Sequence, residues 1–250
     1  MSREAGTRVA LVTGASRGIG ALIAERLAAD GWDLTLCARS PDLLDAQATQ
    51  LGENHGANVV RVLADMANED EVVRVAEAHA AAYGRLDALV LNAGMGSIGP
   101  ISEFPVRRFD KLFAVNVRAA YVLVQRVLPL LRATAGSAPD ATAKVIAVSS
   151  MTGMVGEPLN AAYGATKAAL TSLCETLNSE ESQAGVIATA VCPGYVATDM
   201  TAPLADKVSP EVMIDPADVA EVVVALTRLS GSVVIPSIAM TRPGPHIWRA

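Results

Sequence analysis

The sequence predicts an α/β protein, with one domain built on a doubly wound parallel sheet of seven strands and helices on both faces. Two observations predict this class. Short apolar segments alternate with longer amphipathic ones from residue 8 to residue 237, without a linker or a change in composition. The 250-residue chain is 51% hydrophobic but only 4% aromatic, and small aliphatic residues suit buried parallel strands under closely packed helices. We therefore expect a single domain over residues 1–250.

The seven apolar segments have the length and the Val, Leu, Ile and Ala content of strands. The predicted strands are residues 8–13, 33–38, 58–63, 87–92, 144–149, 186–191 and 232–237. The predicted helices are residues 18–30, 41–54, 68–83, 105–132, 160–184 and 215–229. Asp215 followed by Pro216 is a helix start signal, because the acid caps free N–H groups and proline fits the first turn.

A long irregular connection, residues 193–214, follows the sixth predicted strand. Strands that alternate with helices form right-handed βαβ units, whose ligands bind at the carboxyl ends of the strands. This connection begins at that edge, so we expect a substrate lid, with an ordinary surface loop as the alternative.

Charge and composition exclude several classes of function. The net charge of −6 and the absence of a basic run disfavour a nucleic-acid surface. Cys37, Cys174 and Cys192 lack C-x-x-C spacing and the three histidines are far apart, so neither a disulfide framework nor a metal site is predicted. No signal peptide and no run of about 20 apolar residues can be recognised, so we expect a cytoplasmic protein without a membrane span.

A glycine-rich turn follows the first predicted strand and opens a helix. It reads Thr13-Gly14-Ala15-Ser16-Arg17-Gly18-Ile19-Gly20. Glycine permits a tight turn and close backbone approach, and the helix N-terminus offers free N–H groups to a pyrophosphate. Strand, turn and helix in this order predict a dinucleotide site of the Rossmann type, with a purely structural turn as the alternative. The cofactor-binding candidates here are Gly14, Ser16, Arg17, Gly18, Ile19 and Gly20.

The residues after the second predicted strand indicate which dinucleotide binds. An acid there would bind the ribose 2′-hydroxyl of NAD(H), whereas a cation accommodates the 2′-phosphate of NADP(H). The chain has Arg39 and Ser40 at this place, no acid, and Arg17 in the glycine turn. Two guanidiniums able to hold one phosphate favour NADP(H), with NAD(H) as the alternative cofactor.

Two further strand ends add cofactor-binding candidates. Asp65, with Met66 beside it, is placed to accept a hydrogen bond from the adenine amino group, and capping of the next helix is the alternative. Asn92, Ala93 and Gly94 end the fourth predicted strand, where small residues let the backbone approach a ligand. A plain turn is the alternative for Asn92.

Tyr163 and Lys167 are the candidate proton-transfer pair. Four positions apart in a predicted helix, they lie on one face, and an ammonium beside a phenol lowers the pKa of the phenol. Such a tyrosine can exchange a proton with an alcohol or a carbonyl. Ser150 ends the fifth predicted strand and could help to hold the substrate oxygen. Without these neighbours, a packed ring beside a solvated charge would be the better explanation of the pair.

Together these motifs resemble the short-chain dehydrogenase/reductase family over residues 8 to about 200. The resemblance implies a catalytic tetrad of Asn116, Ser150, Tyr163 and Lys167. In it, Tyr163 is the general acid of carbonyl reduction and Ser150 positions the oxygen. Lys167 binds the nicotinamide ribose and lowers the tyrosine pKa, while Asn116 holds a water of the proton relay in a distorted helix.

The resemblance also implies where the nicotinamide lies and how the chain assembles. Pro193, Gly194, Val196, Ala197 and Thr198 would contact its carboxamide, and hydride would pass from its C4 to a carbonyl carbon. A homodimer or homotetramer is implied, with the 160–184 helix as one contact. The chain departs from the usual family pattern in SVVIPSIAMTRPGPHIWRA, which weakens assignment as a fatty-acid ketoacyl reductase.

We therefore predict an NADP(H)-dependent oxidoreductase acting on a carbonyl or secondary alcohol of a fairly apolar small molecule. The alternatives are a 3-oxoacyl thioester reductase, an epimerase or dehydratase on the same scaffold, and a non-catalytic dinucleotide-sensing protein. A sensor would have no need of the proton-transfer groups. The expected pocket wall is apolar and consists of Met95, Met154, Val155, Leu159, Tyr195 and parts of 200–213.

Overall fold

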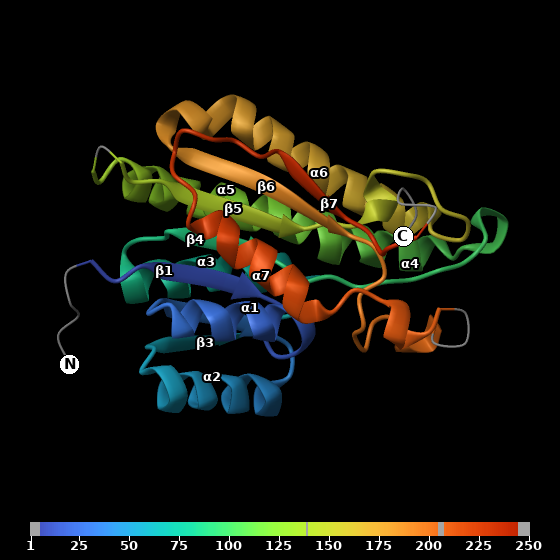
Figure 1. The fold of residues 1–250 in the computed structure, drawn as a ribbon, viewed down its shortest axis with the longest axis horizontal. Helices are drawn as coiled ribbons and strands as arrows, with labels where there is room; N and C mark the ends of the chain where they lie inside the picture. The colour runs from blue at the N-terminus through green and yellow to red at the C-terminus, as the bar shows by residue number, and fades with distance from the viewer. Residues whose placement is uncertain (1–5, 139, 205–207, 245–250) are drawn as a thin grey trace.

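One parallel sheet of seven strands forms the centre of the computed structural model, which describes residues 6–138, 140–204 and 208–244 (Figure 1). The strand order is β3-β2-β1-β4-β5-β6-β7, and every neighbouring pair is parallel. The order reverses between β1 and β4, which makes the sheet doubly wound and confirms the predicted fold class. The strands are β1 Val9–Thr13, β2 Asp33–Ala38, β3 Val59–Leu63, β4 Ala88–Leu91, β5 Ala143–Val148, β6 Val186–Pro193 and β7 Ser237–Met240.

Helices cover both faces of the sheet (Figure 1). They are α1 Gly18–Ala29, α2 Pro41–His55, α3 Glu69–Tyr83, α4 Val106–Phe113, α5 Ala119–Ala135, α6 Ala161–Glu181 and α7 Pro216–Thr227. One core layer lies beneath α1, α2 and α7, and the other beneath α3, α5 and α6. Every residue of β1, β2, β4, β5 and β6 is buried, as expected for parallel strands covered on both sides.

The last strand lies further along the chain than predicted. Residues 232–237 were expected to form it, but β7 begins at Ser237, and Val233 and Val234 are exposed. The pairing with the carboxyl end of β6 sets this register, because Met240 lies opposite Pro193 and its carbonyl accepts a hydrogen bond from the Gly194 N–H at 2.8 Å. Backbone pairing with β6 therefore sets where β7 begins. The apolar Val-Val-Ile run, on which the prediction depended, does not.

The predicted 105–132 helix is a single helix of 30 residues, Val106–Ala135, interrupted by a π-helical segment at Ala114–Arg118. By length and composition alone it meets the criterion for a membrane-crossing helix, a feature that the sequence analysis did not find. Its residues Leu112, Leu123 and Leu131 are fully buried, the last two in the core layer shared with α3 and α6. Packing against the sheet therefore accounts for part of its apolar composition, since 39% of the apolar window is buried.

Candidate active site

The glycine turn between β1 and α1 is tight, and the residues that follow β4 pack closely against it. Gly14 and Gly18 have left-handed backbones, with φ of 65° and 57°. A Cβ atom at Gly20 would overlap the Gly14 carbonyl oxygen and Nδ2 of Asn92. No side chain caps the first N–H groups of α1, so they remain available to a bound anion.

Asn92, which follows the neighbouring strand β4, and Thr13, the last residue of β1, hold this turn in place. The Asn92 side-chain amide donates to the carbonyls of Thr13 and Gly14, each at 3.0 Å. The Thr13 hydroxyl accepts from the backbone N–H groups of Asn92 and Ala93, also at 3.0 Å, and donates to Val90 O. Asn92 is thus a brace between the carboxyl ends of β1 and β4. Thr13 was missed as a site residue, because a threonine at a strand end carries no signal until its cross-strand partners are known.

The residues expected around the adenosine end lie at the same edge of the sheet. Arg39 is exposed after β2, and Ser40 precedes α2 without capping it through its side chain. Arg17 is exposed and forms an ion pair of 3.1 Å with Asp199. Asn68 caps α3, while the Asp65 carboxylate accepts from the Ala67 N–H at 3.0 Å, so Asp65 does not cap that helix. Met66 is buried against Cys37.

Asn116 is buried inside the π-helical segment and bonds in three directions. Its side chain accepts from Met95 N at 2.9 Å and donates to Met95 O and to the Thr166 hydroxyl at 3.0 Å. Thr166 in turn donates to Tyr163 O at 2.7 Å. Asn116 therefore ties the chain after β4 to the helix that carries Tyr163 and Lys167. Thr166, which is fully buried, is a second residue that the sequence analysis missed.

Tyr163 and Lys167 lie together on α6, as their spacing predicts. The Lys167 ammonium lies 5.6 Å from the centroid of the Tyr163 ring and donates to Val148 O at 2.8 Å. Burial raises the pKa of Tyr163 to about 12, opposed by a hydrogen bond with Ser150. Burial also lowers the pKa of Lys167 to about 8. The expected lowering of the tyrosine pKa is thus wrong for the protein by itself, because removal of the phenol from water outweighs its neighbours.

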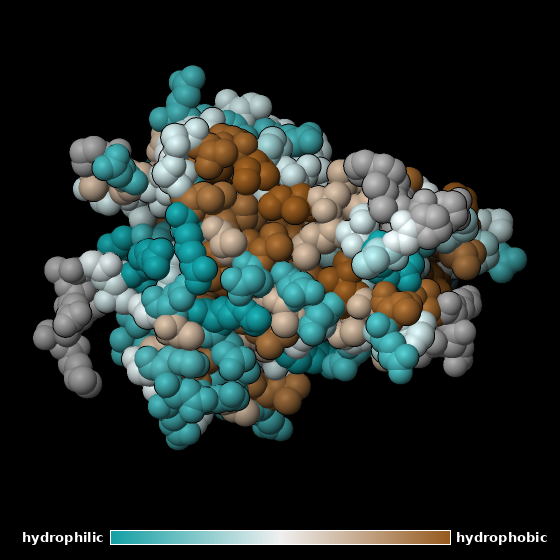
Figure 2. All heavy atoms as spheres, in the orientation of Figure 1, coloured by the Kyte–Doolittle hydropathy of each residue, from teal (hydrophilic) through white to brown (hydrophobic). Residues whose placement is uncertain are grey.

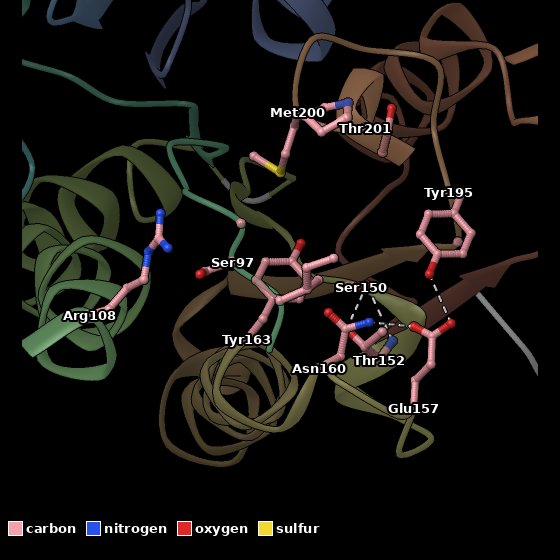
Figure 3. A pocket seen from close by; sticks show the side chains of 14 residues that line it. Ser97, Arg108, Ser150, Thr152, Glu157, Asn160, Tyr163, Tyr195, Met200 and Thr201 are labelled. Atoms are coloured by element: carbon pink, nitrogen blue, oxygen red, sulfur yellow. Dashed lines mark hydrogen bonds between the residues drawn. The ribbon is translucent and has the colours of Figure 1, made fainter. Parts of the chain in front are cut away.

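A cavity of about 300 Å³ opens in front of Ser150 and Tyr163 (Figure 3). Its lining comes from four parts of the chain: Gly96, Ser97, Ile98, Arg108, Ser150, Thr152, Glu157, Asn160, Tyr163, Gly194, Tyr195, Met200, Thr201 and Pro203. A pocket at the carboxyl ends of the strands, with a phenol and a hydroxyl in its wall, can hold and protonate a small oxygen-containing molecule.

The comparisons agree with this geometry. The family model for short chain dehydrogenases matches residues 8–209. The chain is a short-chain dehydrogenase. Relatives include the 3-oxoacyl-[acyl-carrier-protein] reductase FabG of Staphylococcus aureus (strain N315), 32% identical over 209 residues that cover 83% of this chain and 82% of the relative. The D-beta-hydroxybutyrate dehydrogenase of Rhizobium meliloti (strain 1021) is 30% identical over 206 residues, 82% of this chain and 76% of the relative.

Solved structures place the dehydrogenase in the same family. An alcohol dehydrogenase from Thermococcus sibiricus, complexed with 5-hydroxy-NADP, has a TM-score of 0.85 at 28% identity, covering 94% of this chain and 96% of that one. The L-sorbose reductase of Gluconobacter frateurii, complexed with NADPH and L-sorbose, has a TM-score of 0.83 at 27% identity, covering 94% of each chain.

The pocket wall of this dehydrogenase is mostly apolar, as predicted, but it also contains the charged side chains of Arg108 and Glu157. Tyr195, Met200, Thr201 and Pro203 line it as expected, but Met95, Met154, Val155 and Leu159 are not among the lining residues, and the last three are exposed. Leu159 has a left-handed backbone, with φ of 68°, and its carbonyl accepts from Gly99 N at 2.8 Å. In this loop Glu157 and Asn160 line the pocket instead.

Residues 193–214 form the segment predicted to be a lid. Within it, residues 205–207 lie outside the part of the chain that the structure describes. Its two ends are joined by a bridge between Val196 and Ile214, and the N–H of Ile214 donates to Tyr195 O at 2.9 Å. Val196 packs in the core, and Gly18 of the glycine turn lies close to the Thr198 methyl group. The dehydrogenase thus brings the glycine turn and the start of this segment side by side.

Gly94, a cofactor-binding candidate, lies close to two of the catalytic candidates. A Cβ at Gly94 would lie 3.5 Å from Asn116 Oδ1 and 3.6 Å from the Lys167 ammonium. The Asn92–Gly94 strand end therefore lies beside Asn116 and Lys167. Within the described ranges, no three His, Cys, Asp or Glu side chains are close enough together to hold a metal ion.

Proposed function

We propose that this dehydrogenase transfers hydride between NADP(H) and the carbonyl or secondary alcohol of a small molecule, with Tyr163 as general acid and base. The observation that carries the proposal is that the Tyr163 phenol and Ser150 line the same pocket, with the buried Lys167 ammonium 5.6 Å from the centroid of the Tyr163 ring. We further propose that the enzyme works in the cytoplasm.

The residues at the strand edge fit a dinucleotide. Gly14, Gly18 and Gly20 leave the turn free of side chains, and the uncapped N-terminus of α1 suits a pyrophosphate. Arg17 and Arg39 would hold a 2′-phosphate. Asp65 would contact the adenine, Gly94 and Lys167 the nicotinamide ribose, and Gly194 and Thr198 the carboxamide. When bound, the cofactor supplies or accepts the hydride.

Each catalytic candidate has a role that its environment supports. Ser150 and Tyr163 would hold the substrate oxygen from one side, and Tyr163 would deliver its proton to that oxygen during reduction. Because its pKa of about 12 keeps the phenol protonated at neutral pH, the proton is available for this step. Lys167 would offset the negative charge left on the phenolate, and Asn116 fixes the spacing between the strand edge and α6.

Replacement of the phenol tests the proposal. We expect Tyr163→Phe to lower kcat for ketone reduction by about 10²- to 10⁴-fold, the usual contribution of a general acid, because the ring stays while the proton is lost. NADPH consumption with a panel of ketones and aldehydes measures turnover, and fluorescence titration measures NADPH binding. Turnover retained within a few-fold would refute the role of Tyr163.

The cofactor preference has its own support and test. Two structural neighbours are complexed with NADP-type cofactors, and Arg17 and Arg39 are the cations that would hold a 2′-phosphate. The ratio of kcat/KM with NADPH to that with NADH should exceed about 10, the value of one charge-assisted contact. A ratio that favours NADH would contradict it.

A 3-oxoacyl thioester reductase is the second candidate, favoured by the FabG relatives. Acetoacetyl thioesters in the same substrate panel separate it from reduction of simple ketones. A dinucleotide sensor would bind NADPH and turn over nothing in the panel.

We also propose that the enzyme is a homodimer or homotetramer. Figure 2 shows hydrophobic residues gathered over the β7 edge of the sheet, and Leu229, Val233 and Val234 are exposed there. A contiguous apolar surface of this kind is typical of an interface. Light scattering on the eluted protein should give a multiple of the chain mass, and a monomer at all concentrations would contradict the proposal.

A further inference from the structure

Glu157 places a carboxylate in the wall of the substrate pocket. It comes from the loop between β5 and α6, six residues before Tyr163. Its two oxygens have one partner each: Oε1 accepts from the Tyr195 hydroxyl at 2.9 Å, and Oε2 accepts from the Asn160 amide at 2.8 Å. Both partners line the same pocket (Figure 3).

These two hydrogen bonds orient the Glu157 carboxylate but do not use all of its acceptor positions. Each carboxylate oxygen accepts about two hydrogen bonds, so acceptor positions remain on both oxygens. None of the ion pairs found between described residues includes Glu157. The Arg242 guanidinium lies over the ring of Tyr195, 5.5 Å from the ring centroid. The charge is therefore oriented by neutral donors and is open to a further donor from within the pocket.

Asn160 and Tyr195 act as positioning residues for Glu157. Asn160 is buried and directly precedes α6, and the Tyr195 hydroxyl reaches Glu157 from the segment after β6. Burial and the Glu157 hydrogen bond raise the pKa of Tyr195 to about 12, so its hydroxyl remains a donor at neutral pH. Two separate parts of the chain thus hold one acceptor in place.

The opposite side of the pocket carries donors. Figure 3 shows Glu157, Asn160 and Tyr195 on one side of Tyr163, and Arg108 and Ser97 on the other. One carboxylate and one guanidinium give the lining no net charge. A ligand with neutral hydroxyl groups suits both sides, because a hydroxyl donates to Glu157 and accepts from Arg108, whereas an ammonium only donates.

We infer that the substrates are neutral hydroxylated ketones or aldehydes, with Glu157 accepting a hydrogen bond from a substrate hydroxyl while the carbonyl lies at Ser150 and Tyr163. This inference rests on the proposed function and names its substrate class. It adds hydroxyl groups to the fairly apolar small molecule expected from the sequence, because Glu157 and Asn160 line the cavity.

Matched ketones test the inference. Erythrulose and 2-butanone have the same carbon chain with and without hydroxyls, and hydroxyacetone, aminoacetone and acetone form a second set. We expect Glu157→Ala to lower kcat/KM for erythrulose and hydroxyacetone about 10- to 100-fold, the value of a hydrogen bond to a charged group. For 2-butanone and acetone the change should stay within about threefold, since those ketones have no hydroxyl for Glu157 to accept from.

For each ketone, kcat/KM of the variant is divided by kcat/KM of the parent. The higher intrinsic reactivity of hydroxyketones cancels in this ratio, because the same ketone is used with both proteins. Glu157→Gln keeps the side-chain volume and removes the charge, so it repeats the test if the alanine variant folds poorly. Glu103→Gln, at an exposed position that does not line the pocket, is the matched control and should change neither ratio. Equal losses for hydroxylated and plain ketones would overturn the inference, as would a loss confined to aminoacetone.

Failure of the proposed function gives a different result. If the parent enzyme reduces no ketone with either cofactor, the proposed function fails. The affinity of erythrulose for the NADP⁺-saturated protein, measured by calorimetry, then decides the inference alone. Tenfold weaker binding in Glu157→Ala supports it, and unchanged or absent binding overturns it.

Discussion

At Tyr163 and Lys167, burial acts on two neighbouring groups in opposite ways. It raises the pKa of the phenol to about 12 and lowers the pKa of the ammonium to about 8. At pH 7 the phenol therefore keeps its proton and the lysine is mostly charged. In reduction the phenol can therefore give its proton, and the Lys167 cation lies beside the phenolate that this step leaves.

We assign Arg39 to the 2′-phosphate of NADPH, so its replacement tests the preference for NADPH over NADH. Arg39→Asp replaces an exposed cation by an acid that can accept from a ribose 2′-hydroxyl. We expect kcat/KM with NADPH to fall by about 10-fold or more and that with NADH to hold or rise, since a charge-assisted contact is lost and a repulsion gained. Initial rates with both cofactors measure this, and a proportional fall with both would contradict it.

Gly20 leaves no room for a side chain. A methyl group there would overlap the Gly14 carbonyl and the Asn92 amide, so Gly20→Ala must displace the turn. We expect a loss of about 1–3 kcal/mol in the free energy of unfolding, as for other overpacked sites, and NADPH binding weakened by about 10-fold or more, because the turn no longer presents its N–H groups. Urea unfolding and fluorescence titration measure the two effects.

Gly52 provides the matched control for Gly20. It lies inside α2, and a Cβ there would make only an ordinary contact, 3.7 Å from Ala57 O. Gly52→Ala should raise stability by about 0.5–1 kcal/mol through helix propensity and leave NADPH binding unchanged. If both variants behave alike, steric crowding at the turn is not the cause.

The candidate site residues that form sequence motifs could be predicted. The residues that hold other site residues in place through long-range hydrogen bonds could not. The tetrad and the glycine turn combine residue identity with distance along the chain, which a sequence displays directly. Thr13, Thr166 and Glu157 act through partners 79, 50 and 38 residues away. Those contacts exist only once the sheet has formed, so no local pattern could indicate them.

Between elements, one surface ion pair joins the glycine turn to the segment after β6. Arg17 and Asp199 lie 3.1 Å apart, and both are exposed. Asp199 thus holds a guanidinium that we assign to the 2′-phosphate. Asp199→Asn should lower KM for NADPH about two- to fivefold and leave KM for NADH unchanged, because an exposed pair contributes at most about 1 kcal/mol.

Salt provides the control for this prediction. Ions screen exposed charges, so the difference between the parent and Asp199→Asn should shrink as ionic strength rises. Equal changes with NADPH and NADH would show that Asp199 acts on the protein rather than on Arg17.

Helices were predicted more accurately than the last strand for a physical reason. Amphipathic periodicity and caps are local, and Asp215 does accept from Ala217 N at 2.8 Å at the start of α7. The π-helical turn at Ala114–Arg118 followed only from family resemblance, since nothing local in Ala-Val-Asn-Val-Arg demands it. The register of β7 depends on Pro193 and Gly194, more than 40 residues earlier in the chain.

For the molecule as a whole, buried thiols set an alkaline limit to stability. Burial raises the pKa of Cys37 and of Cys174 from 9.0 to about 12. Between those values the folded protein keeps protons that the unfolded chain releases, so stability is fully present below pH 9 and declines as the pH rises. Each thiol should remove about 1.4 kcal/mol per pH unit in this range.

Cys174→Ala isolates one of these contributions. It should cost a constant amount of about 1 kcal/mol for the lost sulfur, and it should make the decline above pH 9 less steep, because one ionising thiol is gone. Urea unfolding in reducing buffer at several pH values measures both terms. Parallel pH profiles for parent and variant would contradict the assignment.

The pairing of Gly194 with Met240 has a consequence for biosynthesis. Domains fold as units while the chain emerges, starting from the N-terminal side. Most of the sheet can pair before β7 is made, but the corner at Pro193 and Gly194 receives its backbone partner only from residues 237–240. A nascent chain can thus hold a nearly complete sheet in which Gly194, one residue of the pocket wall, still lacks its backbone partner. The ribosome must release the final strand before this enzyme can begin to work.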